Sequence, residues 1–449
     1  MTSRHPPVSA REFPIFTTAA AARPSRRGLL RAAVAGAAAT AATPLLAACG
    51  TAVGEPPGKV ALHGDNPGWA APLEAAGAAM RPVDGVRLVP EVIPSLESFE
   101  QVVKSSLRTS KTPDLLKYWS GYRLQDLART GGIVELEKEW ERAERQGWVE
   151  PSLRSAFTYR GRVHGLPMNL AYWVFYYNPA VFRDHGLTKP TTWHAFLKAA
   201  DRLKRAGITP LHATTSGRWP SFIWFQEMLS RQDPQFYDDL MNGRARYTDP
   251  RTERAMRTIA SFADKGWFTS LDMDQATAAA AMVHGKVGMV PGATWLGTSF
   301  TGVGGKIGEN VDTFVLPMQN PKAKAAMIFE SSALVCTVKG PDHTEALRAS
   351  GAWLHPKVAK AFSHTLQDGS PNPLVPPANA MIAGVAETAR HGRLRLLNRF
   401  WELGPPELVE STVDDLAGFL LNPSAYRKTL TTMQGRADEA WKVWKEADA

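Results

Sequence analysis

The chain has 449 residues, 44% of them hydrophobic, a formal net charge of +9 and only two cysteines. This length suits two lobes of ordinary size better than one simple core, and two cysteines exclude a disulfide framework. Six arginines and one acid in residues 1–49 account for +5 of the charge, so the remainder is near +4, which argues against a nucleic-acid-binding protein.

The first 49 residues predict an export signal. Ser25-Arg26-Arg27-Gly-Leu-Leu-Arg31 matches the twin-arginine pattern, and an alanine-rich apolar run follows over residues 32–48. The run ends in Leu46-Ala-Ala-Cys49, which resembles the bacterial lipobox, where the cysteine is lipidated. Residues 1–49 are therefore expected to be a twin-arginine lipoprotein signal, with Arg26, Arg27 and Cys49 as its functional residues. An uncleaved membrane anchor with an incidental cysteine is the alternative.

Residues 50–58 are rich in glycine and proline and predict a flexible tether. Beyond it the pattern alternates between elements: residues 59–63 and 86–93 predict strands, and residues 69–80 and 96–107 predict helices. Such alternation is typical of an α/β protein with a mostly parallel sheet, which binds ligands at the carboxyl ends of its strands.

The stretch from residue 161 to residue 210 carries the clearest local signals. Residues 172–177 form an unbroken aromatic and aliphatic run that Asn178-Pro179 stops, which favours a buried strand. Thr192 is a suitable N-cap for a helix, and Gly207 is a suitable stop for it. The apolar residues of this helix share one face: Trp193, Phe196, Leu197, Ala200 and Leu203.

The later part of the chain predicts a strand that ends near Val290, because Pro291 and Gly292 follow it and are expected to prevent its continuation. Trp295 should then leave the sheet edge.

Cys336 lies in an apolar, strand-like run and is expected to be a buried structural thiol. Helices are expected over residues 222–230, 346–355 and 358–366, a loop over residues 367–377, and helix in the remainder as far as Trp444. Arg390, Arg393, Arg395 and Arg399 are expected to form a solvated helix face.

Four short motifs occur in order in the stretch from residue 161 to residue 210. They are Gly161-Arg-Val-His-Gly-Leu-Pro167, Tyr177-Asn-Pro179, Pro190-Thr-Thr-Trp193 and Ala206-Gly-Ile-Thr-Pro210. Together they resemble the hallmark segment of bacterial extracellular solute-binding proteins, the maltose-type receptors that feed sugars to ABC importers. The resemblance extends from about Lys59 to the end of the chain. It implies an α/β fold of two lobes, of the type II periplasmic-binding-protein-like class, joined by several crossing segments around a central cleft.

This resemblance also implies how the lobes divide the chain. Residues 59–170 and 330–370 are expected to form lobe I, and residues 171–329 with the C-terminal helices of residues 371–449 are expected to form lobe II. The crossings are expected near Asn169, Glu330 and Gln367.

The usual signatures of an enzyme are absent from the sequence. It contains no G-x-S-x-G, S-x-x-K, H-E-x-x-H, P-loop or G-x-G-x-x-G motif, and its eleven histidines are scattered without metal-ligand spacing. Asp272 and Asp274 are expected to be solvated rather than metal ligands. We therefore expect no catalytic residue, no cofactor and no metal site.

Tryptophan is the notable residue, with fourteen in the chain. Sugars present flat C–H faces ringed by hydroxyls, so a cleft for them needs aromatic platforms and a few hydrogen-bonding groups. The candidate ligand-binding residues are Asp65, Trp119, Tyr172, Trp173, Trp219, Trp295, Glu330 and Trp401. Only one of Tyr172 and Trp173 can face the cleft, because side chains alternate along a strand. The resemblance implies stacking roles for Trp119, Trp295 and Trp401.

The function that the resemblance implies is a lipid-anchored receptor, on the outer face of the cell membrane, that closes on a carbohydrate by hinge motion. The ligand is expected to be an oligosaccharide and the partners to be the permease subunits of an ABC transporter. The receptor is expected to be a monomer without enzymatic activity or nucleic-acid binding. Two alternatives stay open: a secreted carbohydrate-active enzyme or sensor, and a receptor for a peptide, a polyamine or an anion.

Overall fold

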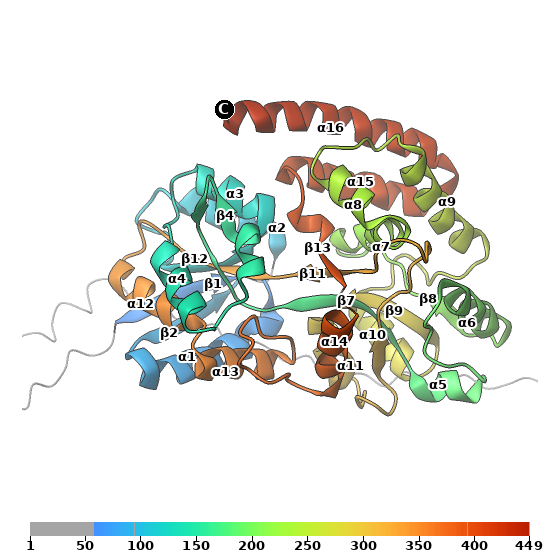
Figure 1. Cartoon of the computed structure of the whole chain (residues 1–449), viewed down its shortest axis with the longest axis horizontal. Helices are drawn as coiled ribbons and strands as arrows, with labels where there is room; N and C mark the ends of the chain where they lie inside the picture. Colours follow the sequence, from blue (N-terminus) through green and yellow to red (C-terminus); the bar gives the residue numbers. More distant parts are fainter. Residues whose placement is uncertain (1–57, 94, 393, 449) are drawn as a thin grey trace, which may run out of the picture. The chain divides into compact units, whose positions relative to one another are not determined.

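The computed structural model describes residues 58–93, 95–392 and 394–448 (Figure 1). They belong to one compact unit, Pro56–Ala449. The expected signal residues Arg26, Arg27 and Cys49 and nearly all of the expected tether therefore lie outside the described residues. Within the described ranges, none of the helices combines the length and the hydropathy of a membrane span.

The first sheet has five strands in the order β2-β1-β3-β12-β6. β1 pairs in parallel with β2 and β3, and β12 runs antiparallel to β3 and β6. The strands are β1 (Lys59–Gly64), β2 (Arg87–Val92), β3 (Leu115–Trp119), β6 (Leu166–Pro167) and β12 (Ser332–Cys336). Every residue of the central strand β3 is buried, so both faces of the sheet are covered there.

Six helices accompany this sheet: α1 (Ala70–Asp84), α2 (Leu96–Ser106), α3 (Gly121–Arg129), α4 (Glu137–Arg145), α12 (His343–Trp353) and α13 (Pro356–Leu366). Helix α1 packs against β2 and α13, although α13 lies almost 300 residues later in the chain (Figure 1). Helices from the C-terminal half of the chain thus pack beside helices from its N-terminal part around the first sheet.

The second sheet has the order β13-β11-β7-β9-β8, with β10 also paired to β7. Its strands are β7 (Ala171–Tyr177), β8 (Thr209–Leu211), β9 (Val287–Ala293), β10 (Asp312–Phe314), β11 (Ala326–Glu330) and β13 (Arg395–Asn398). The helices around it are α5 (Pro179–Asp184), α6 (Trp193–Arg205), α7 (Ile223–Gln232), α8 (Pro234–Met241), α9 (Pro250–Asp264), α10 (Gln275–Val283), α11 (Gly297–Gly302), α14 (Ala380–His391), α15 (Pro406–Leu421) and α16 (Tyr426–Asp448).

Short elements complete the connections. They are the strand pair β4 (Thr158–Tyr159) and β5 (Arg162–Val163), and the 3-10 turns η1 (Pro67–Trp69), η2 (Pro151–Phe157), η3 (Trp219–Phe222), η4 (Thr294–Leu296), η5 (Phe400–Glu402) and η6 (Pro423–Ala425).

The predicted strand and helix of the stretch from residue 161 to residue 210 are confirmed as β7 and α6. Strand β7 is buried throughout because it lies inside the second sheet. The Thr192 hydroxyl caps α6 by accepting a hydrogen bond from the backbone N–H of Ala195 at 3.1 Å. Cys336 is buried in β12, as predicted, and burial raises the pKa of its thiol to about 12.

Strand β9 corrects one expectation, because it does not end before Pro291 but continues to Ala293. The N–H of His212 donates to the carbonyl of Met289, so the backbone N–H and C=O groups of Met289 point toward the neighbouring strand β8. The backbone nitrogen of Pro291, two residues later, points toward the same edge of β9, but β8 has already ended at Leu211. A proline nitrogen has no hydrogen to donate, and at this open edge none is needed.

The C-terminal region corrects a second expectation, since residues 395–398 form strand β13 rather than helix. Strand β13 pairs in parallel with β11, with Arg395 beside Ala326. Arg399 follows the strand and is buried, so it does not belong to a solvated helix face. Arg390 is exposed on α14, and Arg393 lies outside the described residues.

Three segments connect the first sheet and its helices to the second: residues 168–170 between β6 and β7, Ser331 between β11 and β12, and residues 367–379 between α13 and α14. Backbone hydrogen bonds join the first of them to the start of β12, which directly follows the second, and to the third. The N–H of Met168 donates to the carbonyl of Ser332 at 2.8 Å, and the N–H of Leu170 donates to the carbonyl of Gly369 at 2.9 Å. A Cβ atom on Gly369 would lie 2.2 Å from the Leu170 oxygen, so this close approach requires glycine.

Asp368 is fully buried among these segments. One of its carboxylate oxygens accepts from Asn169 Nδ2 at 2.9 Å, and the other accepts from Thr294 Oγ1 at 2.6 Å. Burial raises the pKa of Asp368 to about 6, although both hydrogen bonds oppose the shift. Asp368 therefore joins two crossing segments to the turn η4.

We expect Asp368 to make stability depend on pH. Its folded-state pKa is above the ordinary value of 3.8, so the folded protein takes up a proton that the unfolded chain does not yet bind. Relative to Asp368→Asn, the wild-type protein should gain roughly 1–3 kcal/mol of unfolding free energy as the pH falls from about 7 to about 4. Urea unfolding of both proteins across this range measures the difference. Parallel pH profiles would contradict the expectation.

Candidate ligand cleft

A cavity of about 290 Å³ lies at the ends of strands from both sheets. Its lining comes from the segments that follow β1, β9 and β13, from the ends of β3 and β11, from the first residue of β12 and from the turn η3. The lining residues are Asp65, Asn66, Pro67, Trp69, Lys117, Trp119, Trp219, Phe222, Trp295, Glu330, Ser332, Arg399 and Trp401. Ligands of α/β proteins bind at the carboxyl ends of strands, so this position suits a ligand cleft.

Six of the eight predicted ligand residues line the cleft: Asp65, Trp119, Trp219, Trp295, Glu330 and Trp401. Tyr172 and Trp173 do not. Tyr172 lines a separate cavity of about 560 Å³ beside the proline-rich crossing of residues 371–377. Trp173 is buried behind the cleft, and its indole N–H donates to Glu330 Oε2 at 3.3 Å. The alternation of side chains along β7 separates the two residues.

On the first-sheet side, the central feature is the ion pair of Lys117 and Asp65. Lys117 Nζ lies 2.7 Å from Asp65 Oδ1, and Lys117 is almost completely buried. The ammonium group also lies 5.1 Å from the centre of the Trp69 ring and 5.0 Å from that of the Trp119 ring, within cation–π range. The lysine is thus held by one acid and two indoles.

On the second-sheet side, the central feature is Glu330, which is held by several partners. It forms an ion pair with Arg399 and accepts hydrogen bonds from the indole N–H groups of Trp295 and Trp173. Arg399 also donates from Nε to Glu402 Oε2 at 2.8 Å. Burial raises the pKa of Glu402, and its pairing with Arg399 opposes that shift. Glu330 therefore fixes the indole of Trp295 at the cleft.

The tryptophans of the cleft differ in how much surface they offer. Trp119 and Trp401 are 5% and 3% exposed, whereas Trp219 and Trp295 are only partly buried. The ring centres of Trp219 and Trp295 are 6.4 Å apart, with an angle of 48° between the planes. This pair is therefore the more accessible aromatic surface for a ligand.

Sequence reasoning missed Lys117 and Arg399, although each carried a signal. Lys117 interrupts an otherwise apolar strand, and a lysine is rarely buried there unless it is paired. Arg399 directly precedes two aromatic residues, which distinguishes it from the other arginines of the expected solvated helix face.

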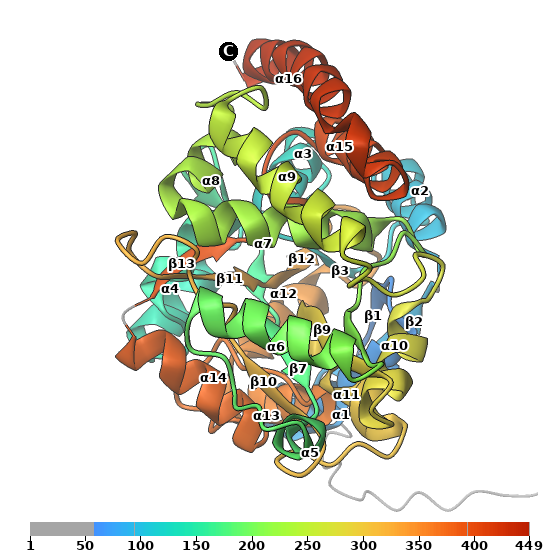
Figure 2. The same cartoon turned by 90° about the vertical axis from the view of Figure 1, so that its right-hand side faces the viewer.

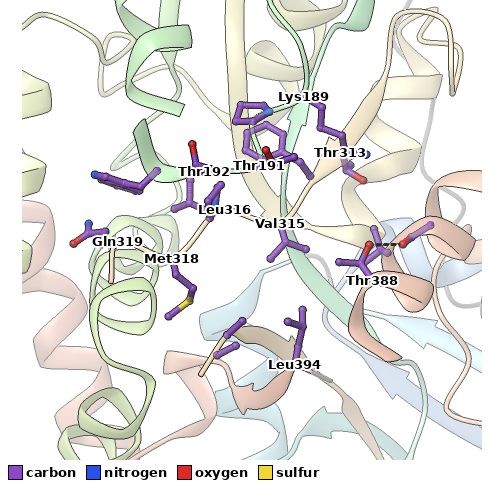
Figure 3. A pocket seen from close by; sticks show the side chains of 18 of the residues that line it. Lys189, Thr191, Thr192, Thr313, Val315, Leu316, Met318, Gln319, Thr388 and Leu394 are labelled. Atoms are coloured by element: carbon purple, nitrogen blue, oxygen red, sulfur yellow. Dashed lines mark hydrogen bonds between the residues drawn. The ribbon is translucent and has the colours of Figure 1, made fainter. Parts of the chain in front are cut away.

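A larger groove, of about 880 Å³, lies elsewhere on the second sheet and shares no lining residue with the cleft (Figure 3). It is formed by the loop before α6, the segment between β10 and β11, and α14. Its lining is largely apolar and includes Val315, Leu316, Met318 and Leu394, which are labelled in Figure 3. Lys189 and Asp312 in its lining form one ion pair, whereas the smaller cleft combines two ion pairs with several indoles and is therefore the better candidate. Among the described residues there is no group of three or more potential metal ligands.

The family model of bacterial extracellular solute-binding proteins matches residues 84–362, more than half of the chain. The chain belongs to this family. Proteins of this family bind solutes rather than transform them, and they are extracellular, so this solute-binding protein acts outside the cytoplasm.

Two solved structures and one curated relative illustrate the similarity. The bacterial solute receptor AcbH, described as having an exclusive preference for β-D-galactopyranose, has a TM-score of 0.76 and 18% identity, covering 86% of this chain and 98% of that one. A chitin oligosaccharide binding protein has a TM-score of 0.73 and 20% identity, covering 86% and 99%. Both likenesses establish the two-lobed fold.

The curated relative is an uncharacterised ABC transporter extracellular-binding protein of Pyrococcus horikoshii, 20% identical over 250 residues. The match covers 51% of this chain and 56% of the relative, so it spans only about half of that protein's length.

Proposed function

We propose that this solute-binding protein binds a carbohydrate in the cleft and delivers it to an ABC permease. One observation carries the proposal: partly exposed indoles stand beside charged groups that are already paired. Trp219 and Trp295 offer apolar faces, and the pairs Lys117–Asp65 and Arg399–Glu330 offer donors and acceptors next to them. A sugar has the same combination of C–H faces and hydroxyls.

The paired charges also distinguish between ligand classes. The cleft lining carries two acids and two bases, and each acid is paired with a base. An anion or a polyamine would have to compete with these pairs for a partner, whereas a neutral polyol accepts from the bases and donates to the acids without breaking them. This arrangement favours a neutral sugar over a peptide terminus, a polyamine or an anion.

The structural neighbours support a sugar ligand, since the receptor AcbH and the chitin oligosaccharide binding protein are both described by the sugars they bind. The relative from Pyrococcus horikoshii supports an ABC transporter as the partner. A secreted carbohydrate-active enzyme is the second candidate. Incubation with a sugar panel separates the two, because a receptor releases its ligand unchanged and an enzyme yields products.

A thermal-shift screen should identify the ligand. A cleft of about 290 Å³ is at the lower end of the usual range for ligand pockets, so the panel should contain monosaccharides as well as oligosaccharides. A sugar at 100 times its dissociation constant should add roughly 2.7 kcal/mol to the unfolding free energy. If no sugar raises the melting temperature while an amino acid, polyamine or anion does, the carbohydrate assignment is wrong.

We further propose that the receptor is a monomer whose two lobes close on the ligand. Lobe I would comprise residues 59–170 and the return segment that ends near residue 370, and lobe II the remainder, with the change of sheet at Ser331. Small-angle scattering should show monomer mass and a smaller radius of gyration when the identified sugar saturates the protein. An unchanged radius at saturation would argue against hinge closure.

The lipid anchor is a separate proposal that rests on the sequence around Cys49. In cells, Cys49→Ser should prevent lipidation and move the protein from the membrane fraction to the soluble fraction. Immunoblotting of fractionated cells measures the distribution, with Cys336→Ser as the matched control that keeps the expected lipidation site. A Cys49→Ser protein that stays in the membrane fraction would favour an uncleaved anchor.

A further inference from the structure

Arg123 lies directly behind the aromatic lining of the cleft without being part of that lining. It belongs to α3, which begins two residues after Trp119, and only 3% of its surface is exposed. A buried arginine requires partners for its charge and for its five N–H groups. The partners of Arg123 connect the cleft to three other elements.

Two cleft tryptophans contact the guanidinium group. Its central carbon lies 4.0 Å from the centre of the Trp401 ring and 5.3 Å from that of the Trp119 ring. Arg123 Nε also donates to the backbone carbonyl of Trp401 at 3.2 Å. Trp119 ends β3 of the first sheet, whereas Trp401 follows β13 of the second sheet. One guanidinium therefore joins an indole from each side of the cleft.

The remaining N–H groups of Arg123 begin a chain of ion pairs. One terminal nitrogen lies 2.8 Å from Glu100 of α2, and the other contacts Glu410 of α15. Burial raises the pKa of Glu100, and Arg123 opposes that shift. Helices α3 and α15 lie side by side at this point (Figure 2). The ion pairs thus link helices that lie almost 300 residues apart in the sequence.

The chain of ion pairs continues from Glu410 toward Trp219, a third tryptophan of the cleft lining. The second carboxylate oxygen of Glu410 lies 2.5 Å from Arg218, which also pairs with Asp414 at 2.5 Å. The hydrogen bond from Arg218 holds the pKa of Asp414 below its ordinary value. Arg218 has a φ of 62°, a conformation that a residue other than glycine keeps only when its surroundings enforce it. The next residue is Trp219, which lines the cleft.

We propose that Arg123 is a positioning residue for the ligand, which orients Trp119 and Trp401 directly and Trp219 through Glu410 and Arg218. The inference rests on the proposed function, because it assigns a role to residues behind the sugar-binding surface. If Arg123 only stabilised the fold, replacing it should change the environments of all tryptophans alike. A positioning role requires that only the tryptophans along the chain of ion pairs respond.

The test is ¹⁹F NMR of protein labelled with 5-fluorotryptophan, recorded without any sugar. Replacing Trp119, Trp219 or Trp401 by phenylalanine in turn assigns the three resonances. Arg123→Met keeps the aliphatic stem but removes the guanidinium, and it should shift the Trp119 and Trp401 resonances by more than a linewidth. Arg123→Lys should shift them too, because an ammonium group lacks the planar fork that contacts both indoles. Trp267 and Trp353, both 1% exposed in the packed interior, should not respond.

The control is Arg244→Met, which removes an exposed arginine that pairs with Asp238 and Asp239 and should leave the three resonances unchanged. Glu410→Gln is the second variant, because it keeps the side-chain shape and should shift Trp219 and Trp401 even if Arg123→Met does not fold. Unchanged resonances in folded variants would overturn the proposal. A common shift of every tryptophan, including Trp267 and Trp353, would also overturn it. Because no sugar is added, these outcomes are independent of whether the carbohydrate assignment is correct.

Discussion

Replacing Trp295 by alanine is expected to weaken sugar binding about 30-fold, a loss of roughly 2 kcal/mol, while the protein stays folded. The indole is partly exposed at the cleft, it faces Trp219, and its N–H group is fixed by Glu330. A preoriented indole offers a large apolar face at little cost in side-chain entropy, and alanine cannot replace that area. Isothermal titration with the sugar identified by the screen measures the affinity, and thermal unfolding measures the stability.

Two control variants make this result specific. Trp295→Phe keeps an aromatic face but loses the hydrogen bond to Glu330, so its affinity should fall between those of the wild type and the alanine variant. Trp193→Ala removes a partly buried tryptophan that lines the larger groove, and it should leave the affinity unchanged. A folded Trp295→Ala protein with wild-type affinity would remove Trp295 from the site. If Trp295 were instead a core residue, the alanine variant should lose about 3–5 kcal/mol of stability.

The largest effect on stability is expected from Arg399→Met, which should lower the unfolding free energy by about 3–5 kcal/mol. Arg399 is buried and neutralises Glu330 and Glu402, both of which are nearly inaccessible to solvent. Methionine fills a similar space but leaves two buried carboxylates without a cation. The cost is that of uncompensated buried charge rather than of lost packing.

The cost of Arg399→Met should depend on pH. Burial raises the pKa of Glu402, and removing Arg399 takes away the largest influence that opposes this shift, so the folded variant takes up protons more readily than the unfolded chain. The variant should therefore regain stability as the pH is lowered from about 8 to about 5. Urea unfolding at both pH values measures this change.

Arg395→Met is the matched control, because Arg395 lies four residues earlier and its side chain is 31% exposed. Its ion pair with Asp238 should contribute no more than about 1 kcal/mol. Equal losses in the two variants would show that the buried ion pairs of Arg399 do not contribute specially to stability.

Local sequence signals predicted local structure well where the responsible residues are close together in the chain. The apolar run before Asn178 predicted β7, and Thr192 predicted the start of α6, because capping and strand propensity act over a few residues. The same reasoning failed at Pro291, where the outcome depended on how far the neighbouring strand β8 extends. It failed again at residues 395–398, whose pairing with β11 is not visible in their own sequence.

The ordered motifs were enough to recognise the family. Aromatic and acidic residues at expected strand ends and in loops also indicated six of the residues that line the cleft, because such patterns are local. The positions of Tyr172 in a different cavity and of Lys117 and Arg399 at the cleft became visible only in the folded protein. The same is true of the contact between Arg123 and Glu410, which lies 287 residues later in the chain. Such contacts depend on how three crossing segments bring the two sheets together. No local propensity encodes which residues, far apart in the sequence, then lie side by side. A buried charge acquires its role only from the partners that the fold places beside it.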